Sequence, residues 1–364
     1  PGDAPAGINL SGGLDSRSVL GLLTVGRTSN SLHTFTFGIP GCDDARIARE
    51  LAAKAGTHHH FLQLKPDYLL EVAEEGVRLT DGMESCVHMH ALAHVNTQAK
   101  HVDIIYTGYL VDSLISPTLQ REWLAKYDDD VAYKLLYDDI NILFLNKNKD
   151  ALFTEDFQKH IDADPYESFR SVASEARAES IADWQNQFEI LNRQRRFTGN
   201  GSELLRGQVV CRTPFTDKDL IEFTMSIPPG LRLDRFLYKK ALARCCHDLS
   251  KIPWEKTGLP LVPCIREVRL RIDQQARWQL QRLGLRKWIS DRKRRPYADY
   301  DTWMRTSLRG WVEKTLLGAR SRERGYFNPD YISNLVAEHI AGADHSRELG
   351  VLITLELWHR QLLD

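Results

Sequence analysis

The first third of the chain alternates short apolar runs with amphipathic stretches of helical period. Strand-like runs lie at residues 7–10, 32–39, 59–64 and 102–109, and helical stretches lie at 16–25, 43–56, 68–82 and 89–101. Such alternation predicts a parallel sheet with helices on both faces. In sheets of this kind ligands bind at the carboxyl ends of the strands.

The pattern becomes mostly helical after about residue 117, and the longest amphipathic stretch covers residues 168–197. Residues 208–223 depart from it, with a short β-rich run, a turn marked by Pro214 and a helix. We therefore predict an α/β core over 1–116 and a mostly helical part over 117–364. The capping rules place Asp43 or Asp44 before the helix at 43–56 and end that helix at Gly56.

Composition narrows the class of protein only slightly. The 364 residues carry 48 Lys and Arg against 49 Asp and Glu, so net charge gives no argument for a nucleic-acid or membrane partner. The basic run at 266–295 is interpreted as a solvated helical face. Six scattered cysteines without a CxxC pair are typical of reduced thiols, so we expect a cytoplasmic protein.

The most informative segment is "INLSGGLDS", residues 8–16, where an apolar strand runs through Ser-Gly-Gly into a helix. Such a turn binds anions, because main-chain N–H groups and the helix dipole both face the ligand. Gly12 and Gly13 allow close approach of a phosphate. Asp15 is explained if Mg²⁺ lies between it and the phosphate. The Lys-Ser/Thr of the Walker loop is absent.

This loop resembles the pyrophosphate loop of the asparagine synthetase family, which belongs to the ATP pyrophosphatases of this loop type. Five later segments resemble that family's synthetase domain in order: residues 32–38, 43–64, 209–223, 251–261 and 348–362. The resemblance implies one synthetase domain over 1–364, with an ATP-pyrophosphatase sheet and residues 203–262 returning to the active site.

The resemblance implies ATP-dependent amide formation. ATP and Mg²⁺ would activate a carboxylate, aspartate or an analogue, as an acyl-adenylate with release of pyrophosphate. Ammonia, a glutamine-derived amine or an internal amine would then attack, releasing AMP. Asp15 and Asp112 would hold the metal, and Lys256 would contact the phosphates and the acyl oxygen. The nucleotide-binding residues would be Ser11, Gly12, Gly13, Leu14, Asp15, Ser16, Phe37, Gly38 and Gly108. The alternatives are a helix cap for Asp112 and an exposed loop lysine for Lys256.

The chain departs from the family after the strand at 102–109. Asparagine synthetases read "SGEGSDE" there, whereas this chain reads "TGYLVDS", with Tyr109 in place of a glutamate and Ser113 in place of an acid. β-Lactam and carbapenam synthetases are similar in having Tyr at this place, where it acts as a base with a distant Glu. A phenol needs such a partner near neutral pH. Proximity in sequence offers Glu122, Asp138 and Asp139, and packing remains the alternative for Tyr109.

The histidines are interpreted as structural. His58 and His60 share one face of a strand, and His90 and His94 are one helical turn apart. Neither pair has an evident third ligand, so we expect no zinc site.

Several questions stay open in the sequence. Glutamine-dependent members of the family carry an N-terminal glutaminase domain, which we expect to precede Pro1; direct use of ammonia or an internal amine is the alternative. A homodimer is possible. The competing classes are a tRNA-modifying enzyme with the same loop, disfavoured by the lack of a Cys motif, and a degenerate nucleotide-binding regulator.

Overall fold

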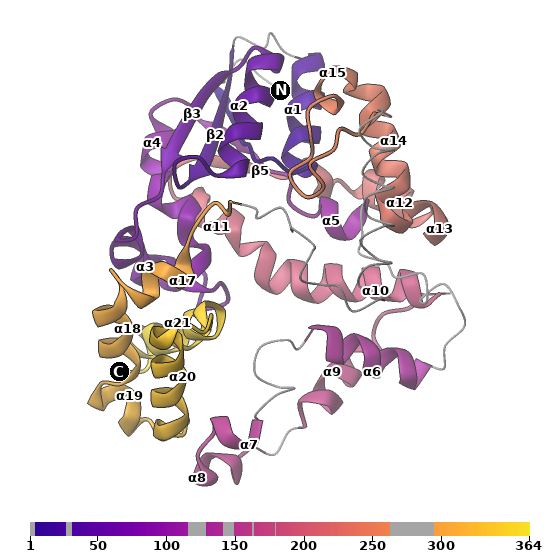
Figure 1. The fold of residues 1–364 in the computed structure, drawn as a ribbon. Helices are drawn as coiled ribbons and strands as arrows, with labels where there is room; N and C mark the ends of the chain where they lie inside the picture. The colour runs from indigo at the N-terminus through magenta and orange to yellow at the C-terminus, as the bar shows by residue number, and fades with distance from the viewer. Residues whose placement is uncertain are drawn as a thin grey trace, which may run out of the picture.

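The computed structural model describes residues 4–26, 31–115, 129–140, 149–161, 164–178, 180–262 and 295–364. Its centre is a five-stranded, wholly parallel sheet with strand order β3-β2-β1-β4-β5 (Figure 1). The strands are β1 (Ala6–Asn9), β2 (Leu32–Gly38), β3 (His58–Gln63), β4 (Ile104–Tyr106) and β5 (Val210–Arg212). The predicted α/β class with a parallel sheet is confirmed.

Helices cover both faces of the sheet and form most of the rest of the described chain. In the core they are α1 (Asp15–Gly26), α2 (Asp43–Ala55), α3 (Tyr68–Leu79), η2 (Cys86–His94), α4 (Val95–Ala99) and α5 (Val111–Leu114). The middle helices are α6 (Asp129–Ile140), α7 (Lys149–Leu152), α8 (Glu155–Gln158), α9 (Pro165–Ala173), α10 (Ile181–Glu189), η4 (Ile190–Thr198) and α11 (Asn200–Arg206). After β5 come η5 (Pro214–Thr216), α12 (Lys218–Met225), α13 (Pro229–Arg232), η6 (Leu233–Arg235), α14 (Phe236–Cys245) and α15 (His247–Ser250). The last are α17 (Tyr300–Arg305), α18 (Arg309–Leu316), α19 (Ala319–Glu323), α20 (Pro329–Ala341) and α21 (Ser346–Leu362).

Helix α2 follows its sequence pattern but is capped differently than predicted. Ile47 and Leu51 are buried against the sheet, and Gly56 ends the helix with φ of 70°. The N-cap is Cys42, whose sulfur accepts the Ala45 N–H, so the assignment of the cap to Asp43 or Asp44 was wrong. Both acids lie in the first turn, where the helix dipole favours negative charge.

Two predicted helices have a different form. Residues 86–94 are a 3₁₀ helix and only 95–99 are α-helical. The long stretch at 168–197 divides into α9, α10 and the π-helix η4, because Ser180 accepts the Asp183 N–H and starts a new helix. A residue that caps a helix competes with continuation of the preceding one.

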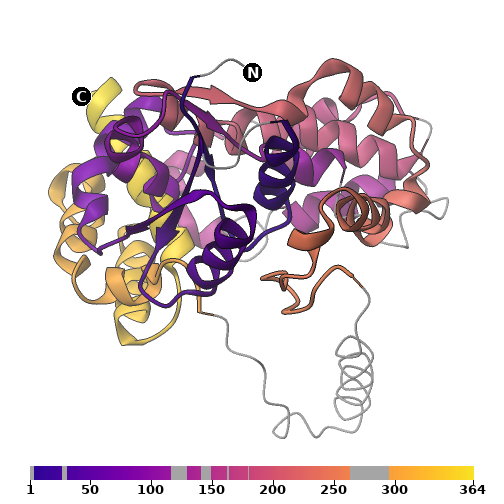
Figure 2. The same cartoon turned by 90° about the horizontal axis from the view of Figure 1, so that it is seen from above.

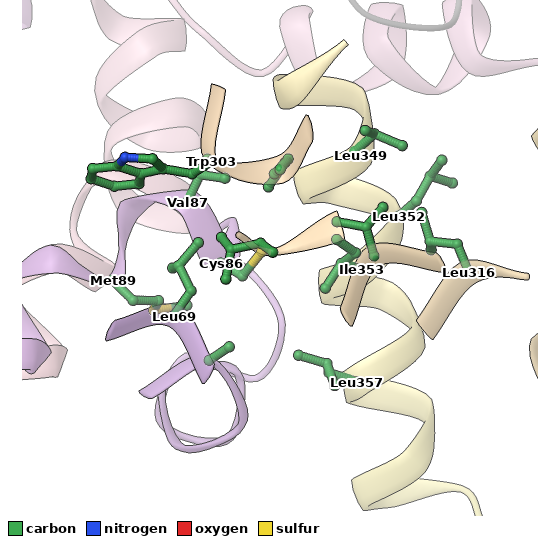
Figure 3. Close-up of a cluster of buried hydrophobic side chains, with 14 of the residues drawn as sticks. Leu69, Cys86, Val87, Met89, Trp303, Leu316, Leu349, Leu352, Ile353 and Leu357 are labelled. Atoms are coloured by element: carbon green, nitrogen blue, oxygen red, sulfur yellow. The ribbon is translucent and has the colours of Figure 1, made fainter. Parts of the chain in front are cut away.

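Three apolar clusters hold these layers together. Helices α1, α2 and α14 pack on one face of the sheet around Ile8, and η2, α4 and α11 pack on the other around Phe35 and Ile105. The C-terminal helices bury a separate cluster against α3 and η2, with Leu69 and Ile353 at its centre (Figure 3). Figures 1 and 2 place α17–α21 on one side of the sheet and α12–α15 on the other. The sheet therefore lies between two groups of helices, α17–α21 and α12–α15.

Candidate active site

The loop between β1 and α1 is braced by its own side chains. The Ser11 N–H donates to Ser16 Oγ (3.0 Å), and the Gly13 N–H donates to Ser11 Oγ (3.1 Å). The Gly12 N–H donates to Asp44 Oδ1 at 2.7 Å. The loop therefore already binds one carboxylate oxygen, which is the behaviour expected of an anion-binding turn.

Arg17 ties this loop to the Lys256 segment. Its side chain is fully buried and donates to the carbonyls of Ile252 (2.7 Å), Pro253 (2.9 Å) and Gly12 (3.4 Å). The Glu255 N–H also donates to the Gly12 carbonyl, at 3.1 Å. Two segments far apart in sequence are thereby held in one arrangement. The sequence analysis did not single out Arg17.

Asp15 and Asp112 come together from the ends of neighbouring strands. Burial and the Asp112 charge raise the pKa of Asp15 from 3.8 to about 7, although Arg235 and Tyr238 oppose the shift. Arg235 donates to Asp112 Oδ1 (2.9 Å), and the Tyr238 hydroxyl donates to Asp15 Oδ1 (3.3 Å). The Asp112 side chain is 57% exposed, so this pair of carboxyls opens to solvent.

Basic side chains gather around Trp254 beside these acids. The charged groups of Arg235, Lys239 and Lys256 lie 5.5, 5.7 and 5.9 Å from the centre of its ring. Lys256 is exposed, but its loop is closed by a hydrogen bond of 2.7 Å from the Gly258 N–H to the Trp254 carbonyl. Gly258 has φ of +69°, which favours glycine. Arg235 and Lys239 were not anticipated from sequence.

A cavity of about 540 Å³ opens next to the loop at the carboxyl ends of β1, β2 and β4. Ser11, Phe37 and Tyr109 contribute to its wall, and its charged lining residues are Asp44, Glu84 and Arg193. Its volume lies within the usual range for small-molecule sites. The loop thus borders a space large enough for a nucleotide or an organic acid.

The other residues predicted to bind nucleotide lie around this space without forming its wall. Leu14 is buried in the core beneath α1. A Cβ at Gly108 would lie 2.8 Å from Asp15 Cβ, and one at Gly38 would lie 2.7 Å from Cys42 Sγ. Both glycines therefore permit close packing behind the site.

Tyr109 reaches the cavity but donates its hydroxyl proton to the protein. Its Oη lies 2.8 Å from the main-chain carbonyl of Gln194, and burial raises its pKa. In this arrangement the side chain is a neutral phenol. The Gln194 side chain in turn donates to Ser113 Oγ (2.7 Å), and Ser113 donates to Glu189 Oε2 (3.0 Å).

The carboxylates proposed from sequence as partners of Tyr109 receive no support. Asp138 is paired with Lys134 at 3.1 Å, and its side chain is 47% exposed. Glu122 and the side chain of Asp139 lie outside the described residues. The half-buried carboxylate of Glu189, more than seventy residues further along the chain, belongs to the same network. It is joined to Tyr109 only through Gln194, whose main-chain carbonyl accepts from the phenol and whose side chain donates to Ser113.

The histidine pair His90 and His94 and the basic run at 266–295 were also singled out in the sequence. His90 and His94 pack against Phe37, with ring centres 5.7 and 6.0 Å away, and His94 Nε2 contacts the Gln63 carbonyl. Neither histidine belongs to a group of three potential ligands within the described ranges. The basic run at 266–295 lies outside the described residues except for Arg295.

Comparison with known proteins identifies the family of this chain. A family model described as asparagine synthase matches residues 2–255 and 273–360. "Asparagine synthetase [glutamine-hydrolyzing]" of Mus musculus is 24% identical over 258 residues, covering 70% of this chain and 38% of that protein. The protein of the same name from Triphysaria versicolor is 22% identical over 263 residues, covering 69% and 37%. "Asparagine synthetase [glutamine-hydrolyzing] 2" of Oryza sativa subsp. japonica is 37% identical over 81 residues, covering 20% and 14%.

The chain thus spans at most 38% of the length of these relatives. Within the described ranges, each helix falls short of the length or the apolar character that crossing a bilayer requires. The match with the family model extends over most of the sequence, including the loop, both aspartates and the segment up to Glu255. This chain therefore belongs to the asparagine synthase family.

Proposed function

We propose that this chain is a ligase that uses ATP to activate a carboxylate as an acyl-adenylate and then joins it to an amine. The observation that carries the proposal is the meeting of three elements at one edge of the sheet. These are an anion-binding loop that borders a cavity of about 540 Å³, a pair of carboxyls that includes Asp15 at the end of this loop, and a basic cluster whose Arg235 contacts Asp112. Transfer of an adenylyl group needs each of them.

The phosphates of ATP would lie over the start of α1. The N–H groups of residues 11–13 have acceptors in the protein, and one of these acceptors is the carboxylate of Asp44, whose place a phosphate oxygen would take. The first turn of α1, which begins at Asp15, adds N–H groups without partners inside the helix. Lys256 and Lys239 would neutralise the leaving pyrophosphate, since charge develops there in the transition state.

Asp15 and Asp112 fit a magnesium ion. Burial and then the Asp112 charge raise the pKa of Asp15, and Arg235 offsets this rise only in part. A divalent cation would supply the missing charge, and Mg²⁺ takes one or two protein carboxylates together with phosphate oxygens. When bound, Mg²⁺ would polarise those phosphate oxygens.

The carboxylate to be activated would occupy the cavity beside Ser11. Arg193 is the one arginine or lysine among its described lining residues, which suits a second acidic group on the substrate. On another part of the wall Glu84 is buried and lies 2.6 Å from His88 Nδ1. A substrate with both an acid and an amine, such as aspartate or an analogue, matches this pair of charges.

Tyr109 would act in the second half-reaction, because its side chain reaches the cavity at the end of β4. As a neutral phenol it can orient an incoming amine by hydrogen bonding. To accept the proton of that amine it would need a carboxylate, for which Glu189 is the candidate. An internal amine as the nucleophile is the second candidate function, and it is favoured by Tyr109 in the place of the family's glutamate.

The test is ATP–pyrophosphate exchange with a panel of carboxylates, using the full chain and Mg²⁺. We expect exchange that depends on one class of acid and that falls at least about 100-fold in Lys256→Ala. Lys251→Ala is the matched control, because Lys251 is exposed and pairs with Asp248 outside the site. Retained ATP binding without exchange for any acid would contradict the proposal and support a regulator. Product formation without added ammonia or glutamine would identify an internal amine.

A further inference from the structure

The opposite edge of the sheet, where the strands begin, holds a cluster of imidazoles. His33 is the second residue of β2, His60 lies in β3, and His101 precedes β4. One ring nitrogen from each lies within 4.8 Å of those of the other two. The His33 Nδ1 and His60 Nε2 atoms are 2.9 Å apart, and the rings of His60 and His101 have centres separated by 4.3 Å.

The backbone places these side chains on one face of the sheet. In the parallel register His33 lies opposite His58 and Phe35 lies opposite His60, and side chains two residues apart share a face. His59 points to the other face, where Nδ1 contacts the Thr34 hydroxyl at 3.1 Å. The sequence analysis recognised the shared face of His58 and His60 but lacked the residues from other segments.

We propose that His33, His60 and His101 bind a divalent transition metal ion such as Zn²⁺. Three imidazoles with a water in the fourth position form a common coordination set for zinc. In a tetrahedral site with bonds of about 2.05 Å the ligand nitrogens are about 3.3 Å apart. His33 Nδ1 and His60 Nε2 lie 2.9 Å apart and the nitrogens of the group all lie within 4.8 Å of one another, so small side-chain rotations complete the set.

The surroundings favour the metal-binding form of the rings. His33 Nδ1 and His60 Nε2 share a hydrogen bond of 2.9 Å, so one proton lies between two nitrogens and a metal ion would replace it there. Phe35 lies against His60 with ring centres 5.0 Å apart and shields one side of the cluster. His101 is exposed and leaves the other side open to an ion from solvent.

Nitrogen ligands distinguish this cluster from the two aspartates. Imidazole suits zinc, cobalt, nickel and copper, whereas Mg²⁺ prefers carboxylate and water oxygens. The strand β2 separates the two sites along its length, because His33 is at its start and Phe37 is near its end. The inference is therefore independent of the proposed ligase activity.

The site would stabilise the sheet. An ion bound to these three residues joins the starts of β2 and β3 to the turn before β4, which are separate segments of the chain. A ligand that binds only the folded state raises its stability. We therefore expect Zn²⁺ to raise the melting temperature of the protein.

The experiment is titration of the metal-free full chain with Co²⁺ in excess Mg²⁺, followed by visible absorption and competition with Zn²⁺. We expect one equivalent of Co²⁺, the intense visible bands of tetrahedral cobalt, and displacement by Zn²⁺. His101→Ala and His60→Ala should each weaken binding at least about 100-fold and abolish the rise in melting temperature. His247→Ala, a change at an exposed histidine in α15, should leave both unchanged.

His101→Ala is the decisive variant because His101 is exposed and its loss spares the core. Its far-ultraviolet circular dichroism, unchanged from the parent, serves as the folding control. Absence of a one-to-one complex, or binding unchanged in His101→Ala, would overturn the inference. Exchange activity is measured in parallel: metal binding without exchange would contradict only the proposed function, and exchange without metal binding would contradict only this inference.

Discussion

The two edges of the sheet carry different chemistry on the same five strands. The carboxyl edge combines loop N–H groups, two carboxyls and a basic cluster, and it borders a cavity of about 540 Å³. The amino edge carries the three imidazoles of His33, His60 and His101, and the His60 ring stacks on Phe35. The first edge suits phosphates with a hard cation, and the second suits a soft or borderline cation.

The two sites also differ in how they arise from the sequence, one from a contiguous motif and the other from separate segments. The loop at the carboxyl edge consists mainly of six consecutive residues, 11–16, so a sequence motif is enough to recognise it. The imidazole cluster depends on three histidines from separate segments: the register of β2 and β3 aligns His33 and His60 on one face, and His101 joins them from the turn before β4. Each of the following changes should affect one edge and spare the other.

The largest effect is expected from Asp15→Asn. Loss of a metal-binding carboxylate beside the phosphates should lower ATP–pyrophosphate exchange about 1000-fold, or about 4 kcal/mol in the barrier. Binding of Co²⁺ at the histidines should be unchanged. Asp156→Asn, an exposed change in α8, is the matched control. If exchange fell less than tenfold, the proposed role of Asp15 in catalysis would be contradicted.

Arg17→Met should destabilise the carboxyl edge. The buried guanidinium serves several carbonyls, which would lose their donor, so we expect a fall of about 3 kcal/mol in the free energy of unfolding. Urea denaturation measures it. Arg46→Met, at an exposed arginine paired with Glu50, should change stability by less than about 0.5 kcal/mol. Equal effects of the two changes would show that Arg17 does not fasten the loop.

Tyr109→Phe should separate the two half-reactions. It removes the hydroxyl in the cavity wall, so amide formation should fall about 100-fold while exchange stays within about threefold. Rapid-quench assays of product and exchange measure the two steps. Tyr331→Phe in α20 is the control for loss of a hydroxyl away from the cavity. A parallel fall in both reactions would assign Tyr109 to structure alone.

The smallest effect concerns stability and pH. The folded pKa of Asp15, about 7, exceeds its ordinary value of 3.8, so between these values the folded state binds more protons than the unfolded state. The contribution of Asp15 is full below about pH 4 and is lost as pH rises through 7. Without metal, Asp15→Asn should therefore be more stable than the parent at pH 8 by about 2 kcal/mol, and the gain should shrink towards pH 5. Mg²⁺ should reverse the difference. An Asn variant less stable at pH 8 would contradict the repulsion between the carboxyls.

Local sequence patterns predicted most of the sheet and the loop at residues 11–16. The features that the sequence analysis missed, such as the role of Arg17, depend on contacts between residues far apart in the chain. Arg17 lies three residues from Leu14 and from Leu20, both buried, and that apolar helix face was the signal of its burial. The sequence could not predict which groups Arg17 binds, because two of its partners are the main-chain carbonyls of Ile252 and Pro253, more than 230 residues away. The helix predicted at 168–197 failed at Ser180, where a cap outweighs periodicity.

The central claim is that the carboxyl edge binds the triphosphate of ATP through the loop and a cation held by Asp15 and Asp112. The most direct measurement is a crystal structure of the full chain with a non-hydrolysable ATP analogue and Mn²⁺, with the metal located by anomalous scattering. The account predicts phosphate density over residues 11–16 and a manganese peak between the two aspartates. Nucleotide bound away from this loop, or a metal peak that contacts neither aspartate, would contradict it.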